Sequence, residues 1–248
     1  MRIALSVLLF AGSVLHVDTL SDLKTALAAF DGGEPVKVRV EAGSAQRDGE
    51  AAKQDSAVPT VAALVEDGPQ GLTITWDRAL LQAAAAELQA KSKDPNKSTP
   101  TRSSMDELKP TALSDYLNAP ARVLRLIDEG QLLEEKEAGW EGRPARLLTF
   151  KLTPPLSEKD KKIIKEAEMT ARLWLGADGL PAALETQFHA RGRALLVISF
   201  ETNQKEEFRF ARTGRRLVAT RHLQEIQSSG GGQTGVKKSL VTLQPLES

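Results

Sequence analysis

The last third of the chain, residues 168–246, repeats short stretches in which apolar and polar side chains alternate between turn residues. The clearest stretch is 184–191, where Leu184, Thr186, Phe188 and Ala190 alternate with Glu185, Gln187, His189 and Arg191. A period of two places successive side chains on opposite faces of a β-strand, so this stretch predicts a strand with one buried and one solvated face. Strand after strand joined by short turns predicts a meandering antiparallel sheet.

The same pattern recurs earlier in the chain and predicts about eleven strands in total. They are expected at residues 36–42, 57–66, 72–76, 131–138, 146–152, 168–175, 184–191, 194–201, 206–212, 217–227 and 236–244. Helical spacing of apolar residues predicts helices at 18–30, 77–91 and 105–128, the last interrupted at Pro110 and Pro120. So many antiparallel strands curl strongly or close on themselves. The predicted fold class is therefore mainly β (α+β): a curled antiparallel sheet, an incomplete barrel, covered by two or three helices.

The N-terminus has the pattern of a secretory signal peptide. Met1 and Arg2 precede an apolar run over residues 3–10, and Ala11-Gly12-Ser13 supplies small residues for cleavage. The run is shorter than the ~20 apolar residues that span a bilayer. We expect a signal peptide at 1–13, a single soluble domain at 14–248 without a transmembrane segment, and a periplasmic or secreted bacterial protein. The alternative is that the run forms a buried first strand or helix.

Composition excludes several classes of function. The chain has no cysteine, which excludes a disulfide scaffold, a thiolate metal site, a thiol nucleophile and a lipidated N-terminal cysteine. Its 33 basic and 33 acidic residues cancel, whereas a nucleic-acid surface normally needs a basic excess. We therefore expect no nucleic-acid partner.

Polar motifs give no defensible catalytic site, and we expect neither a cofactor nor a metal. His189 and His222, together with Glu185 and Glu225, could bind a metal only if their strands were neighbours, and a surface or cross-strand pairing is the simpler interpretation. The glycines at 230–232 are followed by a predicted strand, which favours a hairpin loop over a phosphate loop. The basic run 159–165 is either a solvated loop or short helix, or a contact for anionic headgroups.

The stretch Leu173–Glu185, LWLGADGLPAALE, contains a tryptophan-bearing strand, an Asp-Gly turn and a Leu-Pro restart. Together with the order helix, three strands, helices, eight strands, it resembles the LolA/LolB-like family of lipoprotein carriers and their LppX-like relatives. The resemblance implies an incomplete antiparallel barrel with a helical lid, a hollow that holds acyl chains, and a periplasmic lipid or lipoprotein binder. The family's functional arginine matches no particular residue of this chain.

Large aromatic side chains on apolar strand faces are the candidates for the wall of such a hollow, and the simpler interpretation is that they fill a core. They are Trp76, Phe150, Phe188, Phe200, Phe208 and Phe210. The leading hypothesis is a non-enzymatic carrier that shelters an apolar small molecule, lipid or acyl chain. The second is a structural or interaction protein of the cell envelope, with a packed core and a protein partner. An enzyme is the third.

Overall fold

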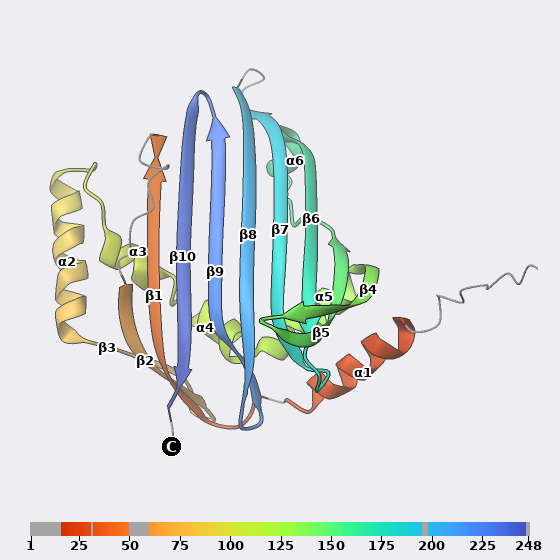
Figure 1. The fold of residues 1–248 in the computed structure, drawn as a ribbon. Helices are drawn as coiled ribbons and strands as arrows, with labels where there is room; N and C mark the ends of the chain where they lie inside the picture. Colours follow the sequence, from red (N-terminus) through yellow and green to blue (C-terminus); the bar gives the residue numbers. More distant parts are fainter. Residues whose placement is uncertain (1–15, 31, 50–59, 195–197, 247–248) are drawn as a thin grey trace, which may run out of the picture.

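The computed structural model describes residues 16–30, 32–49, 60–194 and 198–246. Its centre is one ten-stranded antiparallel sheet in the order β3-β2-β1-β10-β9-β8-β7-β6-β5-β4 (Figure 1). The strands are β1 Val36–Asp48, β2 Thr60–Gly68, β3 Gly71–Trp76, β4 Gln131–Trp140, β5 Arg143–Leu152, β6 Ile164–Leu175, β7 Pro181–Ala194, β8 Ile198–Thr213, β9 Arg216–Gly230 and β10 Gln233–Pro245. Since β3 and β4 lie at opposite edges, the sheet curls without closing. The mainly β, half-barrel fold class is confirmed. The predicted signal peptide at 1–13 lies outside the described residues.

The strand count differs from the prediction at one place. The stretches 194–201 and 206–212 were predicted as two strands, but Ile198–Thr213 is the single strand β8. Thr202, Gln204 and Glu206 continue the two-residue period between Phe200 and Phe208, so the polar interval is part of a strand and not a turn. Polar residues are tolerated there because helices do not cover this part of the sheet.

Six helices accompany the sheet in the described part of the chain. They are α1 His16–Ala28, α2 Arg78–Lys93, α3 Pro100–Asp106, α4 Pro110–Leu117, α5 Ala119–Glu129 and α6 Asp160–Ile163. The predicted interrupted helix at 105–128 corresponds to the end of α3, to α4 and to α5, and the first part of α3 lies in a stretch where no helix was predicted. Each of these three helices has a proline at its first or second position, where the missing N–H costs no hydrogen bond. Helix α2 begins at Arg78, close to the predicted start, and its N-terminus is capped by Asp77, whose Oδ1 accepts a hydrogen bond from the N–H of Ala79 at 2.7 Å.

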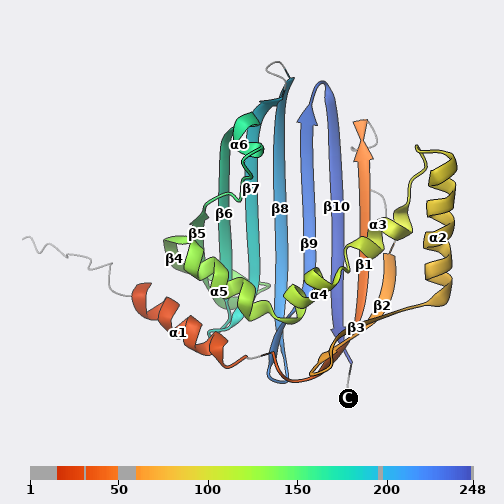
Figure 2. The ribbon, with the colours of Figure 1, turned by 180° about the vertical axis from the view of Figure 1, so that it is seen from behind.

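Helices α4 and α5 cross one face of the sheet, which we call the inner face (Figure 2). They cover only its lower half, as oriented in Figure 1, whereas the upper ends of β6 to β10 extend well beyond them. Helix α1 packs against α5, and α3 packs against β1 and β2. Helix α2 stands beyond the β1–β2 side of the sheet and α6 lies beside the upper ends of β6 and β7.

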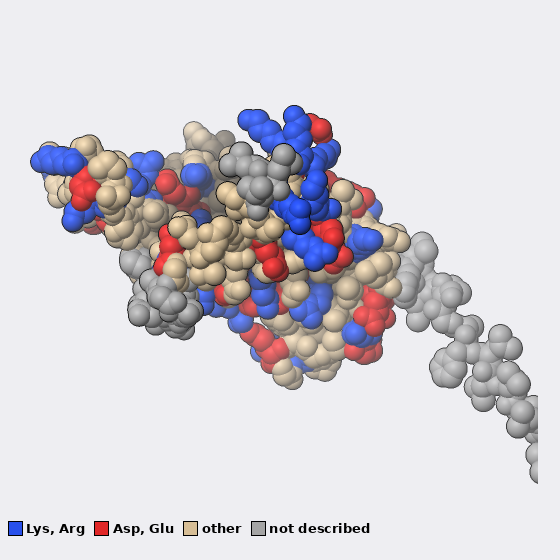
Figure 3. Space-filling model, turned by 90° about the horizontal axis from the view of Figure 1, so that it is seen from above, with Lys and Arg blue, Asp and Glu red and all other residues tan. Residues whose placement is uncertain are grey.

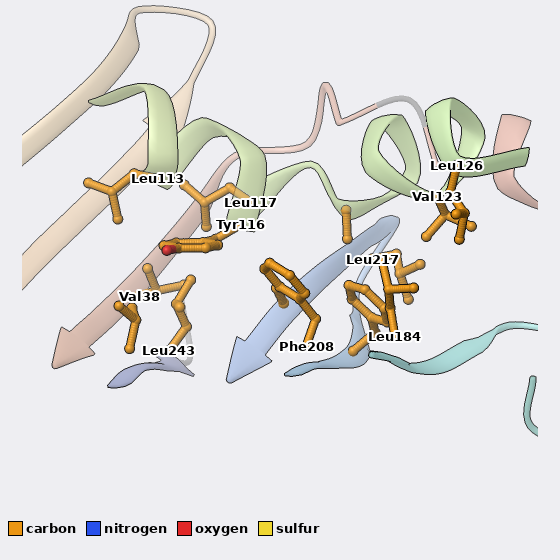
Figure 4. Close-up of a cluster of buried hydrophobic side chains, with 14 of the residues drawn as sticks. Val38, Leu113, Tyr116, Leu117, Val123, Leu126, Leu184, Phe208, Leu217 and Leu243 are labelled. Carbon is orange, nitrogen blue, oxygen red and sulfur yellow. The ribbon is translucent and has the colours of Figure 1, made fainter. Parts of the chain in front are cut away.

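The hydrophobic core lies between these helices and the inner face (Figure 4). Helices α4 and α5 contribute Leu113, Leu117 and Val123, which are almost fully buried. The sheet contributes fully buried Val38, Leu148, Phe150, Leu173, Phe208 and Leu217, among others. Burying side chains of this size stabilises a fold by roughly 1.5–3 kcal/mol each before the entropic cost of ordering them. The lower half of the inner face is therefore filled by packed side chains.

A small second cluster lies on the opposite, outer face. Trp174 packs against Trp140 with ring centroids 4.7 Å apart, beside buried Ala145, Leu147 and Ala183. Trp174 thus points away from Leu173 and Leu175, which belong to the inner core. Among the residues described, no helix combines the length and the apolar character needed to cross a membrane.

Candidate functional site

Successive rows of cross-strand neighbours show how the inner face changes from core to open surface. The first row lies under the helices and is buried from end to end: Leu173, Leu184, Phe208, His222, Val241 and Ala42. The next row upward is mostly polar: Ala171, Thr186, Glu206, Gln224, Ser239 and Ser44. The third row is half-buried or exposed: Met169, Phe188, Gln204, Ile226, Lys237 and Gln46.

We call the part of the inner face from the third row upward the open half. Its apolar side chains, Met169, Phe188 and Ile226, lie on β6, β7 and β9. Phe200 lies on the same face of β8, four residues before Gln204 and therefore further from the helices. It is half-buried and lies opposite Gly192 of β7. These four residues form a partly exposed apolar strip on the part of the inner face that lies beyond α4 and α5. Such a strip on an otherwise polar surface is where an apolar ligand or partner can be sheltered from water.

The β1–β10 side of the open half is polar. Lys237 forms an ion pair with Glu107 of the link between α3 and α4, at 3.0 Å. The backbone N–H of Ser44 donates to Ser104 Oγ at 3.0 Å, which fixes α3 against β1. A hollow of about 750 Å³ lies beside these two contacts, and its lining includes Gln46, Ser103, Glu107 and Lys237. This part of the surface suits the polar portion of a ligand.

A buried polar cluster marks the border between the packed half and the open half. The hydroxyl of Tyr116, on α4, lies 2.9 Å from Nδ1 of His222 on β9. The imidazole of His222 stacks on Phe208, with ring centroids 4.2 Å apart. Its Nε2 lies 3.9 Å from Glu206 Oε2, which is too far for a hydrogen bond. Gln204 and Gln224 each donate to Glu206 Oε1 at 2.7 Å, so the carboxylate is held on the inner face.

Burial sets the protonation of this cluster. It lowers the pKa of His222 to about 4, with the carboxylate of Glu206 opposing the shift and the guanidinium of Arg122 adding to it. Burial likewise raises the pKa of the Tyr116 hydroxyl above its usual value. At neutral pH both groups are uncharged, and the imidazole contributes one donor and one acceptor. The cluster can therefore orient a polar group.

The six aromatic residues predicted to line a hollow do not share one. Phe150 and Phe208 are fully buried in the core, and Phe210 is buried beside Phe208 with ring centroids 6.3 Å apart. Trp76 packs partly buried against the same core from the edge strand β3. Phe188 and Phe200 lie on the open half. The structure therefore separates the predicted set into four core residues and two surface candidates.

The two histidines are not neighbours. His189 lies on the outer face of β7, with Nδ1 2.8 Å from Asn203 Oδ1 and 3.7 Å from Glu201 Oε1, which matches the cross-strand interpretation. His222 points to the inner face. A metal site that combines both histidines with Glu185 and Glu225 is therefore wrong. The two glutamates share the outer face with His189, whereas His222 lies on the other side of the sheet. Across the described residues, no group of three or more His, Cys, Asp or Glu is placed to hold a metal.

Sequence reasoning missed Tyr116 and Glu206. Tyr116 is the single tyrosine of the chain and is one of the buried residues of α4, and no sequence motif singled it out. Glu206 is the first residue of the strand predicted at 206–212, and no motif marked it as a site residue. The two-residue period that runs through Thr202, Gln204, Glu206 and Phe208 would have placed it on the inner face.

Comparison with known proteins gives little similarity. No protein-family model matches the chain, and no curated protein matches it. Among solved structures, the crystal structure of MucB in complex with MucA(peri) matches over 92% of this chain and 93% of that one. The sequence identity is 12% and the TM-score 0.24. A TM-score this low supports no conclusion about function.

Proposed function

We propose that this protein is a non-enzymatic binding protein that holds an apolar ligand, such as a lipid or acyl chain, on the open half of the inner face. The observation behind the proposal is the division of that face into a packed lower half and an uncovered upper half. The apolar strip of Met169, Phe188, Phe200 and Ile226 is only partly buried. Its position beside polar β9, β10 and β1 side chains suits an amphipathic ligand.

The physical driving force is the removal of apolar surface from water. Each methylene group of an acyl chain that leaves water contributes roughly 0.8 kcal/mol. An extended chain laid across β6 to β9 would meet Met169, Phe188 and Ile226 in one cross-strand row. Its polar end would then lie toward Lys237 and Glu107 in the hollow of about 750 Å³. The packed lower half would serve as a rigid support for this surface and not as the ligand cavity.

The sequence adds the expected location. A signal peptide at 1–13 would deliver the protein to the periplasm or the outside of a bacterial cell. The resemblance to LolA/LolB-like carriers points to the same compartment and ligand class. The proposed ligand surface differs from the family's hollow. It is the part of the inner face that extends beyond α4 and α5, whereas the family's hollow lies between the sheet and its helical lid.

Native mass spectrometry tests the proposal. The chain is expressed with its own N-terminus in a bacterial periplasm, purified without detergent, and measured before and after organic extraction. We expect a bound mass of lipid size that extraction removes. A bare protein mass, together with no uptake of a fluorescent fatty acid, would overturn the proposal.

The packed core favours one second candidate, an envelope interaction protein that binds a protein partner on the same open half. The almost complete burial of Leu113, Leu117 and Phe208 makes the helix layer a rigid scaffold without any ligand. A bare mass would favour this function if an envelope protein also co-purified with the chain and was lost on Phe188→Asp.

A further inference from the structure

The upper end of β6 and β7 gathers basic side chains from two directions. Helix α6 and the residues around it provide Lys159, Lys161, Lys162 and Lys165, and the end of β7 provides Arg191 and Arg193. All six are exposed. Figure 3, which looks down on this end of the sheet, shows Lys and Arg side chains crowded there. The segments 158–166 and 191–201 hold these six basic residues and four acidic ones, whereas charges balance over the whole chain.

Most of the acidic residues at this end are already engaged within it. Glu166 pairs with Arg191 at 2.6 Å, and Glu158 pairs with Lys161 at 2.7 Å. Asp160 accepts a hydrogen bond from the Ser157 hydroxyl at 2.6 Å. Within the described part of the chain, no ion pair engages the other four basic side chains: Lys159, Lys162, Lys165 and Arg193. Four cations at one end of the molecule therefore remain available to an external anion.

Exposed apolar side chains lie among these cations. Ile163, at the end of α6, is 38% exposed, and Ile198, at the start of β8, is 40% exposed. Few other large apolar residues of the described chain are exposed to this extent. A hollow of about 630 Å³ beside them is lined by Lys165, Arg191, Arg193 and Phe200, among others. Apolar tips within a basic patch suit the interface of an anionic membrane, where charges meet headgroups and isoleucines enter the acyl boundary.

We propose that this end of the sheet, formed by α6 and the adjoining ends of β6, β7 and β8, docks on the surface of an anionic lipid bilayer. This inference goes beyond the proposed function and stands without it, because it requires no ligand on the inner face. Docking in this orientation would turn the upper edge of the open half toward the membrane. A lipid-binding surface that opens at the same end would then receive its ligand directly from the bilayer.

Vesicle sedimentation tests the docking surface. The purified chain is mixed with vesicles of phosphatidylcholine, or with vesicles in which about a third of the lipid is phosphatidylglycerol. The charge-reversal variant is Lys165→Glu with Arg193→Glu. The matched control is Arg125→Glu with Arg143→Glu, an equal change at exposed positions in the lower half of the molecule. Ile163→Ser with Ile198→Ser tests the apolar contribution, and circular dichroism checks that each variant is folded.

We expect the wild-type chain to sediment with the anionic vesicles and not with phosphatidylcholine. Charge reversal at Lys165 and Arg193 should weaken the partition at least about tenfold, while the control remains close to wild type. Failure of the wild type to bind, equal binding to both vesicles, or equal loss in variant and control would overturn the inference. Equal binding to a soluble polyanion, such as dextran sulfate, would also overturn it, because the surface would then recognise charge without a membrane.

Discussion

The hydroxyl of Tyr116 and Nδ1 of His222 lie 2.9 Å apart and join helix α4 to strand β9 at the upper limit of the packed core. This contact connects the helix layer to the sheet where apolar rows give way to polar ones. Above it, Glu206 is held by two glutamine side chains, and Lys237 is paired with Glu107. The same border separates the half of the inner face that stabilises the fold from the half that is available to a ligand.

Acid should weaken the fold through His222. Its pKa in the folded protein is lowered to about 4 by burial, so the unfolded chain, with a pKa near 6.5, binds a proton first as the pH falls. The titratable and charged groups that face the imidazole of His222 are Tyr116, Glu206, Arg122 and Glu107. Stability is fully present above about pH 6.5 and falls by roughly 2 kcal/mol by about pH 4.5.

Urea unfolding at neutral pH and at about pH 4.5 measures this effect. We expect His222→Gln to reduce the difference in unfolding free energy between the two pH values by about 2 kcal/mol. His189→Gln, on the exposed outer face, is the control and should leave the difference unchanged. If the two variants behaved alike, the buried imidazole would not be the source of the acid sensitivity.

Removal of the Tyr116 hydroxyl should destabilise the protein on its own. Tyr116→Phe leaves the buried Nδ1 of His222 without its partner, which should cost about 1–3 kcal/mol. In a double-mutant cycle with His222→Phe, the second substitution should cost less than it does in the wild type. Strict additivity of the two unfolding free energies would show that the two groups do not interact.

Arg216 should be the most sensitive ion-pairing residue near the lower end of the sheet. It is 3% exposed, pairs with Asp67 at 2.6 Å and donates to the carbonyl of Glu34. Arg216→Met should cost about 2–4 kcal/mol, because it leaves a carboxylate and a carbonyl without their donor. Asp67→Asn, which retains an acceptor, should cost less than half as much. Thermal or urea unfolding of both variants measures the difference, and equal costs would contradict this account.

Gly192 should tolerate no side chain. A Cβ atom there would lie 2.1 Å from the carbonyl oxygen of Ile163 and 2.8 Å from Cζ of Phe200. Gly192→Ala should therefore displace α6 and destabilise the protein by about 1–3 kcal/mol. The control is Gly139→Ala, where the nearest atom lies 3.8 Å away. Unfolding experiments on both variants should show a large effect for the first and a small one for the second.

Local patterns in the sequence predicted most of the fold. Alternation located the strands because each buries one face, and Asp77 marked the start of α2 because its carboxylate can cap the helix. The prediction missed the continuity of β8, because a strand that leaves the helix layer loses its apolar face without ceasing to be a strand. It also treated prolines at 110 and 120 as interruptions, whereas they begin separate helices.

The candidate site was less predictable, because it depends on which parts of the sheet the helices cover. Phe188 and Phe208 have the same pattern in the sequence, yet one lies on the open half and the other in the core. Coverage is set by the path of α4 and α5 across the sheet, which no local pattern encodes. The pairing of Tyr116 with His222 likewise joins residues 106 positions apart.

The central claim is that an apolar ligand binds on the open half of the inner face. Titration of a fluorescent fatty acid into the wild-type chain, Phe188→Asp and Gln187→Asp tests it most directly. The two variants place the same negative charge on neighbouring residues of β7. Phe188 faces the inner side of the sheet and Gln187 the outer side. We predict that Phe188→Asp lowers the affinity at least about tenfold, the cost of placing a charge against an apolar chain, while Gln187→Asp binds like wild type. Absence of binding to the wild type, or equal affinity for all three proteins, would contradict the claim.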